Sequence, residues 1–312
     1  MPGSSMPRPP RWAIPWLPRS AGWTRLTSDS TARRDCSGWS PPPSACTPRL
    51  PVRPVCSTAC PWAAGRRSRW CAMSLLDASL FGAASVAVSA ASLVATGVFH
   101  PRVMLFGPGI WRGPSRQNAV ALTFDDGPHP HYTARIAEVL ARHGARATFF
   151  CIGRELERYA SLARELLDAG HQLENHTYRH DTGRDLFSAS RLEGDLERCQ
   201  QVLVQVTGAR ARYYRPAVGI RNPAVHEAAR RVGMTVVTWT LAARDGARRL
   251  TPKRALALAE RARPGSILAL HDGSPRERSP LREHTLQQLP LLLSRLRERG
   301  FSFVTLSELL SA

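Results

Sequence analysis

Short apolar runs alternate with amphipathic segments from about residue 118 to the end of the chain. Apolar runs of this length predict buried strands, and segments with apolar residues at helical spacing predict helices. The predicted strands are 119–124, 147–150, 173–175, 212–214, 235–239, 266–270 and 301–304. The predicted helices are 132–142, 156–169, 192–206, 223–232, 252–262, 286–299 and 306–310. About seven strand–helix units predict an α/β fold, a parallel barrel with function at the carboxyl ends of its strands.

An uncharged stretch precedes this region. Residues 78–99 carry no charge and are long enough to cross a bilayer. Three interpretations compete: a membrane anchor, a cleaved signal segment, and a buried helix of the α/β domain. Because no convincing small-residue cleavage site is present, we expect an uncleaved anchor that contacts the membrane through 78–99. Arg66, Arg67 and Arg69 precede the stretch and favour a C-terminal domain that faces the periplasm or exterior; secretion is the alternative.

The first 72 residues have a composition of their own. They contain 13 of the 25 prolines, six of the eight tryptophans and five of the seven cysteines, without helical or strand periodicity. Scattered prolines oppose helices and strands alike. We therefore predict a disordered leader and hypothesise that translation starts at Met73. In that case the arginines before the apolar stretch are absent, and its orientation is only weakly determined.

The formal net charge of +19 raises the question of an anionic partner. Lys253 is the only lysine among 43 basic residues, so the arginine excess indicates a coding bias along the whole chain. We find no recognisable nucleic-acid-binding module and expect no nucleic-acid partner. The composition also excludes a collagen, a coiled coil and a fully disordered chain, and seven cysteines are too few for a disulfide scaffold.

Charged or titratable side chains follow five of the predicted strands. They are Asp125 and Asp126, His176 and His180, Arg215, Asp245, and His271. Because parallel strands of a barrel end at one mouth, we expect these side chains to converge there. His176 and His180 have the spacing that grips a metal ion, and together with Asp126 they would leave open positions on a divalent ion.

These motifs resemble those of the polysaccharide deacetylases. The matching strings are Thr-Phe-Asp-Asp-Gly-Pro at 123–128, His-Thr-x-x-His at 176–180, Arg-Pro at 215–216, Asp245, and Leu-His-Asp at 270–272. The family comprises metal-dependent esterases of carbohydrate esterase family four, which share the NodB homology domain. The resemblance implies a distorted (β/α) barrel and the removal of acetyl groups from N-acetylated sugars in chitin-like or peptidoglycan polymers.

The resemblance also implies roles on the metal side of the site. Asp126, His176 and His180 are expected to bind a divalent metal ion, zinc in our interpretation. Asp125 is expected to act as the general base. Arg215 is expected to hold that carboxylate ionised and oriented through a charge-assisted hydrogen bond.

Further roles follow on the leaving-group side. His271 is expected to be the general acid that protonates the leaving amine. Asp245 is expected to orient His271 and to raise its pKa. The backbone N–H of Val218, together with the metal ion, is expected to stabilise the oxyanion.

The sequence departs from the family pattern around the acetyl pocket. Ala217 replaces the second proline of the third motif, and Val218 stands where the family often has tyrosine. The fourth motif lacks one aspartate and its tryptophan, with Ala242 at that place, and Ala269 replaces a leucine of the fifth. We therefore expect an altered pocket and an undetermined substrate. Trp239 either fills part of this gap or belongs to the core, and we favour the core.

The resulting domain prediction has five parts: leader 1–72, transmembrane or signal-anchor segment 73–100, linker 101–117, deacetylase catalytic domain 118–306 and C-terminal tail 307–312. We interpret 276–282, after His271, as a solvated charged loop. Two alternatives to the enzyme remain: a catalytically altered sugar-binding relative on the same scaffold, and a basic nucleic-acid-binding protein. The intact acid–base residues argue against the first, and the oligomeric state is open.

Overall fold

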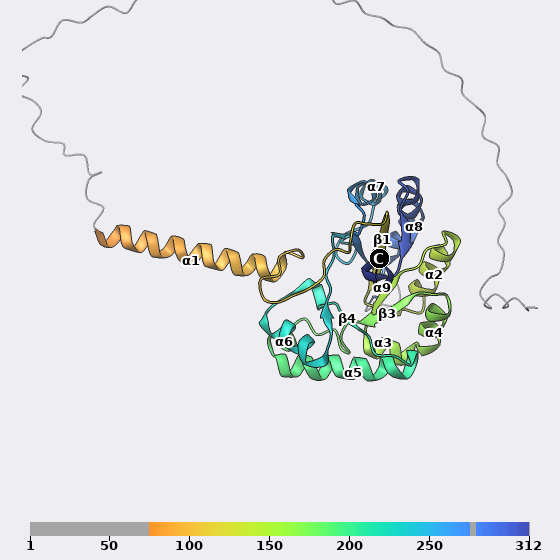
Figure 1. Cartoon of the computed structure of the whole chain (residues 1–312), viewed down its shortest axis with the longest axis horizontal. Helices are drawn as coiled ribbons and strands as arrows, with labels where there is room; N and C mark the ends of the chain where they lie inside the picture. The colour runs from red at the N-terminus through yellow and green to blue at the C-terminus, as the bar shows by residue number, and fades with distance from the viewer. Residues whose placement is uncertain (1–74, 275–278, 312) are drawn as a thin grey trace, which may run out of the picture. The chain divides into compact units, whose positions relative to one another are not determined.

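The computed structural model describes residues 75–274 and 279–311 (Figure 1). The predicted leader 1–72 and the hypothetical start at Met73 lie outside the described residues. The described part consists of one long helix followed by alternating strands and helices, as the hydrophobic pattern predicts.

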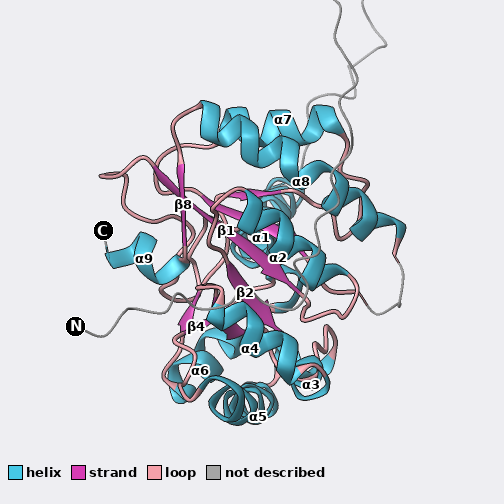
Figure 2. Cartoon of the chain, turned by 90° about the vertical axis from the view of Figure 1, so that its right-hand side faces the viewer, coloured by secondary structure: helices cyan, strands magenta, loops and turns pink. Residues whose placement is uncertain are grey.

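A curled parallel sheet of eight strands forms the centre of the domain. Its order is β5-β4-β3-β2-β1-β7-β6, and β8 also pairs with β1. The bounds are β1 Ala119–Asp125, β2 Thr148–Cys151, β3 Gln172–Asn175, β4 Tyr213–Tyr214, β5 Thr235–Val236, β6 Leu241–Ala242, β7 Ile267–His271 and β8 Ser302–Val304. Helices surround the curled sheet, so the predicted distorted α/β barrel is confirmed (Figure 2).

The helices follow the predicted order, with differences in their bounds. The bounds are α1 Leu75–Phe99, α2 Tyr132–Arg142, α3 Gly153–Arg158, α4 Ala160–Asp168, α5 Ala189–Thr207, α6 Pro223–Val232, α7 Pro252–Arg261, α8 Pro280–Glu298 and α9 Leu306–Ser311, with short 3-10 turns η1 Arg184–Phe187 and η2 Ala217–Gly219. The predicted helix 156–169 is two helices, α3 and α4, because the backbone leaves the helical region at Tyr159. Helix α8 begins at Pro280 instead of residue 286, and β6 was not predicted at all.

The alternation of side chains along β1 builds both the core and the site. All seven residues of β1 are buried, because helices cover one face and the curled interior covers the other. Leu122 and Phe124 belong to the large apolar cluster beneath the helices, whereas Ala121 belongs to the small inner cluster. Since strand side chains alternate, Thr123 and Asp125 share the inner face with Ala121. The strand therefore delivers a polar pair to the interior of the barrel at its carboxyl end.

The segment 101–117, for which we expected a linker, hydrogen-bonds along the barrel. The N–H of Ile110 donates to the carbonyl of Val236 at 2.9 Å, and the N–H of Thr238 donates to the carbonyl of Ile110 at 2.8 Å. The N–H of Gly113 donates to the carbonyl of Gly265 at 2.8 Å. The segment thus runs from β5 toward the start of β7.

Within the described part of the chain, one helix is long and apolar enough to cross a membrane. The span is Gly82–Phe99 in α1, of which only 6% is buried against the rest of the protein. An apolar helix that the domain does not cover needs another apolar environment, and this argues against the third interpretation of the stretch, a buried helix of the domain.

Candidate active site

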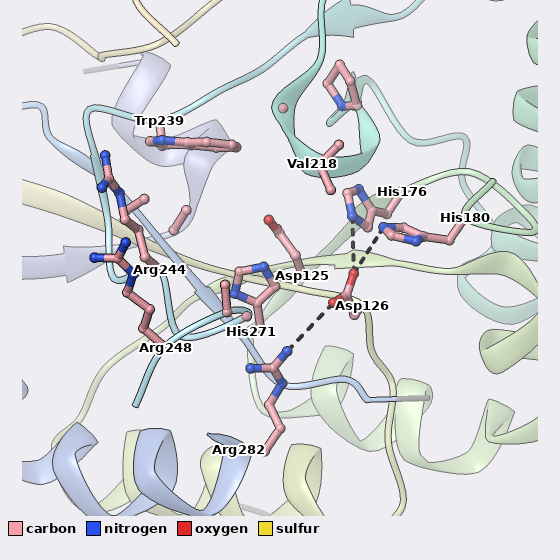
Figure 3. A pocket seen from close by; sticks show the side chains of 16 residues that line it. Asp125, Asp126, His176, His180, Val218, Trp239, Arg244, Arg248, His271 and Arg282 are labelled. Carbon is pink, nitrogen blue, oxygen red and sulfur yellow. Dashed lines mark ion pairs between the residues drawn. The ribbon is translucent and has the colours of Figure 1, made fainter. Parts of the chain in front are cut away.

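A cavity of about 580 Å³ opens where the strands end (Figure 3). Six of the eight predicted site residues line it: Asp125, Asp126, His176, His180, Val218 and His271. The other two, Arg215 and Asp245, are fully buried behind it, each bonded to a lining residue. The structure therefore brings all eight together.

Asp126, His176 and His180 form a compact cluster. The Oδ1 atom of Asp126 lies 3.4 Å from Nε2 of His176 and 3.3 Å from Nε2 of His180. One possible ligand atom from each residue lies within 4.8 Å of the other two. Asp126 and His180 have positive φ angles of 76° and 57°, a conformation that non-glycine residues adopt mainly where the surrounding structure enforces it.

The protonation of this cluster suits a divalent metal ion. Nδ1 of His176 lies 2.7 Å from the carbonyl oxygen of Arg215, so Nδ1 carries the proton and Nε2 presents its lone pair. Burial lowers the pKa of His180 to about 4, which keeps that ring neutral. Burial alone would raise the pKa of Asp126, but the histidines outweigh it and hold the pKa well below its usual value. Two imidazole nitrogens and one carboxylate oxygen form a donor set typical of zinc with open positions.

Asp125 is held by a buried guanidinium. Nη1 of Arg215 donates to Oδ1 of Asp125 and to Oγ1 of Thr123, each at 2.7 Å, and Nη2 donates to the carbonyl of Thr238 at 3.0 Å. The guanidinium also lies over the ring of Phe150, 4.0 Å from its centroid. A charge-assisted bond of this length fixes the direction of the Asp125 carboxyl group.

Replacing Arg215 by methionine is expected to destabilise the fold by about 3–5 kcal/mol, because the change leaves the Asp125 charge buried without its partner. Chemical denaturation of the full chain measures this loss. Arg210→Met is the matched control, since Arg210 pairs with Glu197 on the surface, where a pair contributes about 0–1 kcal/mol. Equal losses of stability in the two variants would show that the buried pair contributes no more to the free energy of unfolding than the surface pair.

His271 is paired with a buried carboxylate. Its Nδ1 lies 2.8 Å from Oδ1 of Asp245, and its backbone N–H donates to Oδ2 of Asp245 at 3.1 Å. Thr285 donates a further hydrogen bond to Asp245 at 2.8 Å, which fixes the carboxylate. Burial alone would lower the pKa of His271, but the charge of Asp245 and its hydrogen bond raise it to about 9. His271 therefore carries a proton at neutral pH, with Nε2 free of the Asp245 bond.

Val218 and Trp239 form the wall opposite the acidic residues. Val218 lies in η2 with a φ of 49°, and its side chain points toward the cavity (Figure 3). Trp239 lines the cavity and also packs against the inner apolar cluster. The ring closes over Gly219, where a Cβ atom would collide with it. The core interpretation of Trp239 is therefore incomplete, because one tryptophan serves both the core and the pocket.

Sequence reasoning missed Arg282. The expected solvated loop 276–282 was wrong at this position, because Arg282 lies in the first turn of α8 and is buried. Its Nη1 donates to the carbonyl of Asp245 at 2.8 Å, and its Nη2 lies 3.9 Å from Oδ2 of Asp126. The missed signal was Ser279 followed by a proline, a combination typical of a helix start.

A second missed feature is the buried carboxyl of Asp272. It accepts a hydrogen bond from Thr133 at the start of α2. Burial, together with the neighbouring carboxylates Asp126 and Asp125, raises the pKa of Asp272 to about 7. A Cβ atom at Gly127 would collide with this carboxyl, so the glycine after the aspartate pair permits the close approach of the β1 and β7 loops.

The fold and the site together define a class of protein: a curled parallel α/β barrel whose mouth holds an Asp–His–His cluster, an arginine-held carboxylate and a carboxylate-held histidine. The sequence model described as polysaccharide deacetylase matches residues 112–237. Taken with the similarity to curated relatives given next, this shows that the chain belongs to the polysaccharide deacetylase family.

Two curated relatives illustrate the similarity. A chitooligosaccharide deacetylase from Azorhizobium caulinodans is 32% identical over 193 residues, which cover 60% of this chain and 91% of the relative. A peptidoglycan-N-acetylglucosamine deacetylase from Bacillus cereus is 33% identical over 202 residues, covering 64% of this chain and 92% of the relative.

A similar solved structure bears on the question of enzymatic activity. A pseudoenzyme of carbohydrate esterase family 4 from Bacillus anthracis is 27% identical, covers 65% of this chain and 69% of its own, and superposes with a TM-score of 0.57. Family membership and fold therefore do not by themselves establish catalysis, and the chemistry has to be argued from the residues of the site.

Proposed function

We propose that this chain is a metal-dependent hydrolase that removes acetyl groups from N-acetylated sugars of a cell-envelope glycan, either peptidoglycan or a chitin-like polymer. The observation that carries the proposal is the convergence of Asp125 and His271 on the cavity that contains the Asp–His–His cluster. Amide hydrolysis needs one group that accepts a proton and another that donates one. Sugar binding alone needs neither.

Asp126, His176 and His180 would hold the metal ion, and zinc is the ion we expect. When bound there, a divalent ion supplies a water molecule of lowered pKa and a polarised acetyl carbonyl. The donor set of the cluster supports this assignment.

Asp125 accepts the proton of the attacking water at its carboxylate. Arg215 holds that carboxylate in place at the cavity through the 2.7 Å bond. His271 donates a proton from Nε2 to the leaving amine nitrogen, and Asp245 holds the opposite ring nitrogen. The backbone N–H of Val218 faces the developing oxyanion. The products are acetate and a free amino sugar.

A pH dependence follows from the His271–Asp245 pair. Because His271 must carry its proton, activity is expected to persist until the pH rises through its raised pKa of about 9. Asp245→Asn removes the charge that raises this pKa, so the alkaline limb of kcat/KM is expected to move by about one pH unit or more toward lower pH. Asp168→Asn, an exposed aspartate on α4, is the control. An unmoved alkaline limb in Asp245→Asn would contradict the acid role.

We further propose that 118–306 is the catalytic domain, that α1 anchors it in a membrane, and that it faces the periplasm or exterior. The support is the uncovered apolar surface of α1 and the insoluble nature of envelope glycans. Cleavage of the segment, which would yield a secreted form, is the competing outcome and is decided by the N-terminal sequence of the mature chain.

The proposed function is tested with the full chain in detergent on chitooligosaccharides, peptidoglycan and an O-acetylated glycan. Acetate and free amine are measured together. We expect both products in equal amounts from an N-acetylated substrate. Acetate without amine would instead identify an esterase. Glycan binding with no product would support the altered sugar-binding relative, and neither binding nor product would contradict the proposal.

A further inference from the structure

A second cavity of about 630 Å³ adjoins the proposed active site. The two share four lining residues: Trp239, Ala242, Arg244 and Arg248. Five arginines line the second cavity, which we name the arginine cavity; they are Arg102, Arg244, Arg248, Arg254 and Arg261. A ligand in the active-site cavity could therefore extend into the arginine cavity.

The arginine cavity holds uncompensated positive charge. Its lining includes no aspartate or glutamate, and within the described residues none of its five arginines forms an ion pair. The guanidinium groups of Arg102 and Arg254 donate, among the described residues, only to backbone carbonyls, namely those of Thr240, Ala243 and Arg249. The side chains of Arg244, Arg248 and Arg261 have no hydrogen-bond partner in the part of the chain that the structure describes.

Some arginines elsewhere on the protein pair with carboxylates. Arg230 and Arg231 both pair with Glu227, and Arg295 pairs with Glu260. What distinguishes the arginine cavity is that five arginines without an ion pair among the described residues gather around one hollow. Five like charges there repel one another, and a bound anion would relieve that repulsion. Guanidinium groups suit phosphate in particular, since their planar donors match its oxygens in pairs.

The geometry places the arginines beside the reacting groups. Arg244 and Arg248 lie together on the opposite side of His271 from His176 and His180 (Figure 3). Both also line the active-site cavity. In a 2-acetamido sugar, the ring carbon that bears the acetamido group is bonded directly to the anomeric carbon. An anomeric phosphate in the arginine cavity would therefore suit an acetamido group near His271.

The same cavity adjoins the end of the apolar helix. Phe99, the last residue of α1, and the next two residues line it. If α1 crosses a bilayer, the cavity lies close to the depth at which lipid phosphates are found. A phosphate-bearing substrate could reach this position either from solution or from the membrane.

We propose that the arginine cavity binds a phosphate carried by the substrate, so that the substrate class is an acetylated amino sugar with a phosphate at its anomeric carbon. This inference rests on the deacetylation that the proposed function assigns to the site. It differs from that proposal in the substrate, because a sugar within a finished polymer has its anomeric carbon in a glycosidic bond and carries no phosphate there. The sugar phosphate is either free in solution or esterified to a membrane lipid.

The test compares three substrates of the full chain in detergent: N-acetylglucosamine, N-acetylglucosamine 1-phosphate, and the same sugar phosphate esterified to a polyprenol. We expect kcat/KM to be about tenfold or more higher for the phosphate-bearing substrates than for the neutral sugar, because one hydrogen bond to a charged group contributes a factor of this size. A larger value for the polyprenyl substrate assigns the lipid source, and equal values assign the soluble one.

Two variants locate the effect. Arg248→Gln is expected to reduce the ratio of kcat/KM between phosphate-bearing and neutral sugars about tenfold, toward equal values for the two. Arg164→Gln is the matched control, because it removes an exposed arginine on α4 that forms no ion pair with any residue in the described part of the chain. Equal kcat/KM for neutral and phosphate-bearing sugars would overturn this inference and leave the proposed function intact.

A binding measurement separates the two possible failures. If no substrate releases acetate, calorimetric titration with N-acetylglucosamine 1-phosphate still measures the affinity of the arginine cavity for the sugar phosphate. Binding that Arg248→Gln weakens and Arg164→Gln does not would support the phosphate site even though the proposed function had failed. Absence of binding, or equal binding by both variants, would overturn it.

Discussion

Asp125→Asn is expected to reduce acetate release by about 10²- to 10⁴-fold, the usual contribution of a general base. The amide side chain of asparagine cannot accept the proton of the attacking water at neutral pH. Metal binding is expected to stay at the wild-type level, because Asp125 does not belong to the Asp–His–His cluster. Acetate assays and metal analysis on the same preparation measure both quantities.

Asp168→Asn makes the same chemical change at an exposed position on α4 and is expected to behave as the wild type. Retained activity in Asp125→Asn would remove the general-base assignment. Loss of the metal together with the activity would instead indicate that Asp125 is a ligand.

His176→Ala is expected to weaken zinc binding by at least about 100-fold. Losing a residue that only hydrogen-bonds to a metal ligand already costs up to about 100-fold, and losing a ligand should cost more. Acetate release is expected to fall in parallel, since His176 supplies one of three ligand atoms. Competition with a chelator of known affinity measures the binding, and circular dichroism verifies the fold.

The control for this variant is His284→Ala, which removes a histidine of α8 that does not line the cavity. Unchanged zinc affinity in His176→Ala would show that the ion lies elsewhere. A change of equal size in both variants would show a nonspecific effect.

The hydrophobic pattern predicts the centre of the barrel best because β1 and β2 are buried on both faces. The run at 119–124 became β1, and the amphipathic period gave α2 its bounds of Tyr132–Arg142. The pattern failed where an element depends on distant contacts. Strand β6 is only Leu241–Ala242, which is too short to show a hydrophobic pattern. It is a strand because it pairs with β7.

The candidate site was predictable where its residues end strands. Asp125 and His271 are the last residues of β1 and β7, which pair directly with Asp125 opposite His271. Arg282 was hidden because its site role depends on α8 approaching the mouth of the barrel from outside the sheet. The arginine cavity was hidden for a similar reason, since its members come from the segment after α1, the loop after β6, and α7.

The measurement that tests the central claim most directly is acetate release by the full chain before and after removal of its metal. We expect a chelator to abolish the release of acetate from the best N-acetylated substrate and one equivalent of zinc to restore it, with the zinc lost again in His176→Ala. Acetate release that persists in metal-free protein would contradict the account, as would complete inactivity of protein with one zinc ion bound at the Asp–His–His cluster.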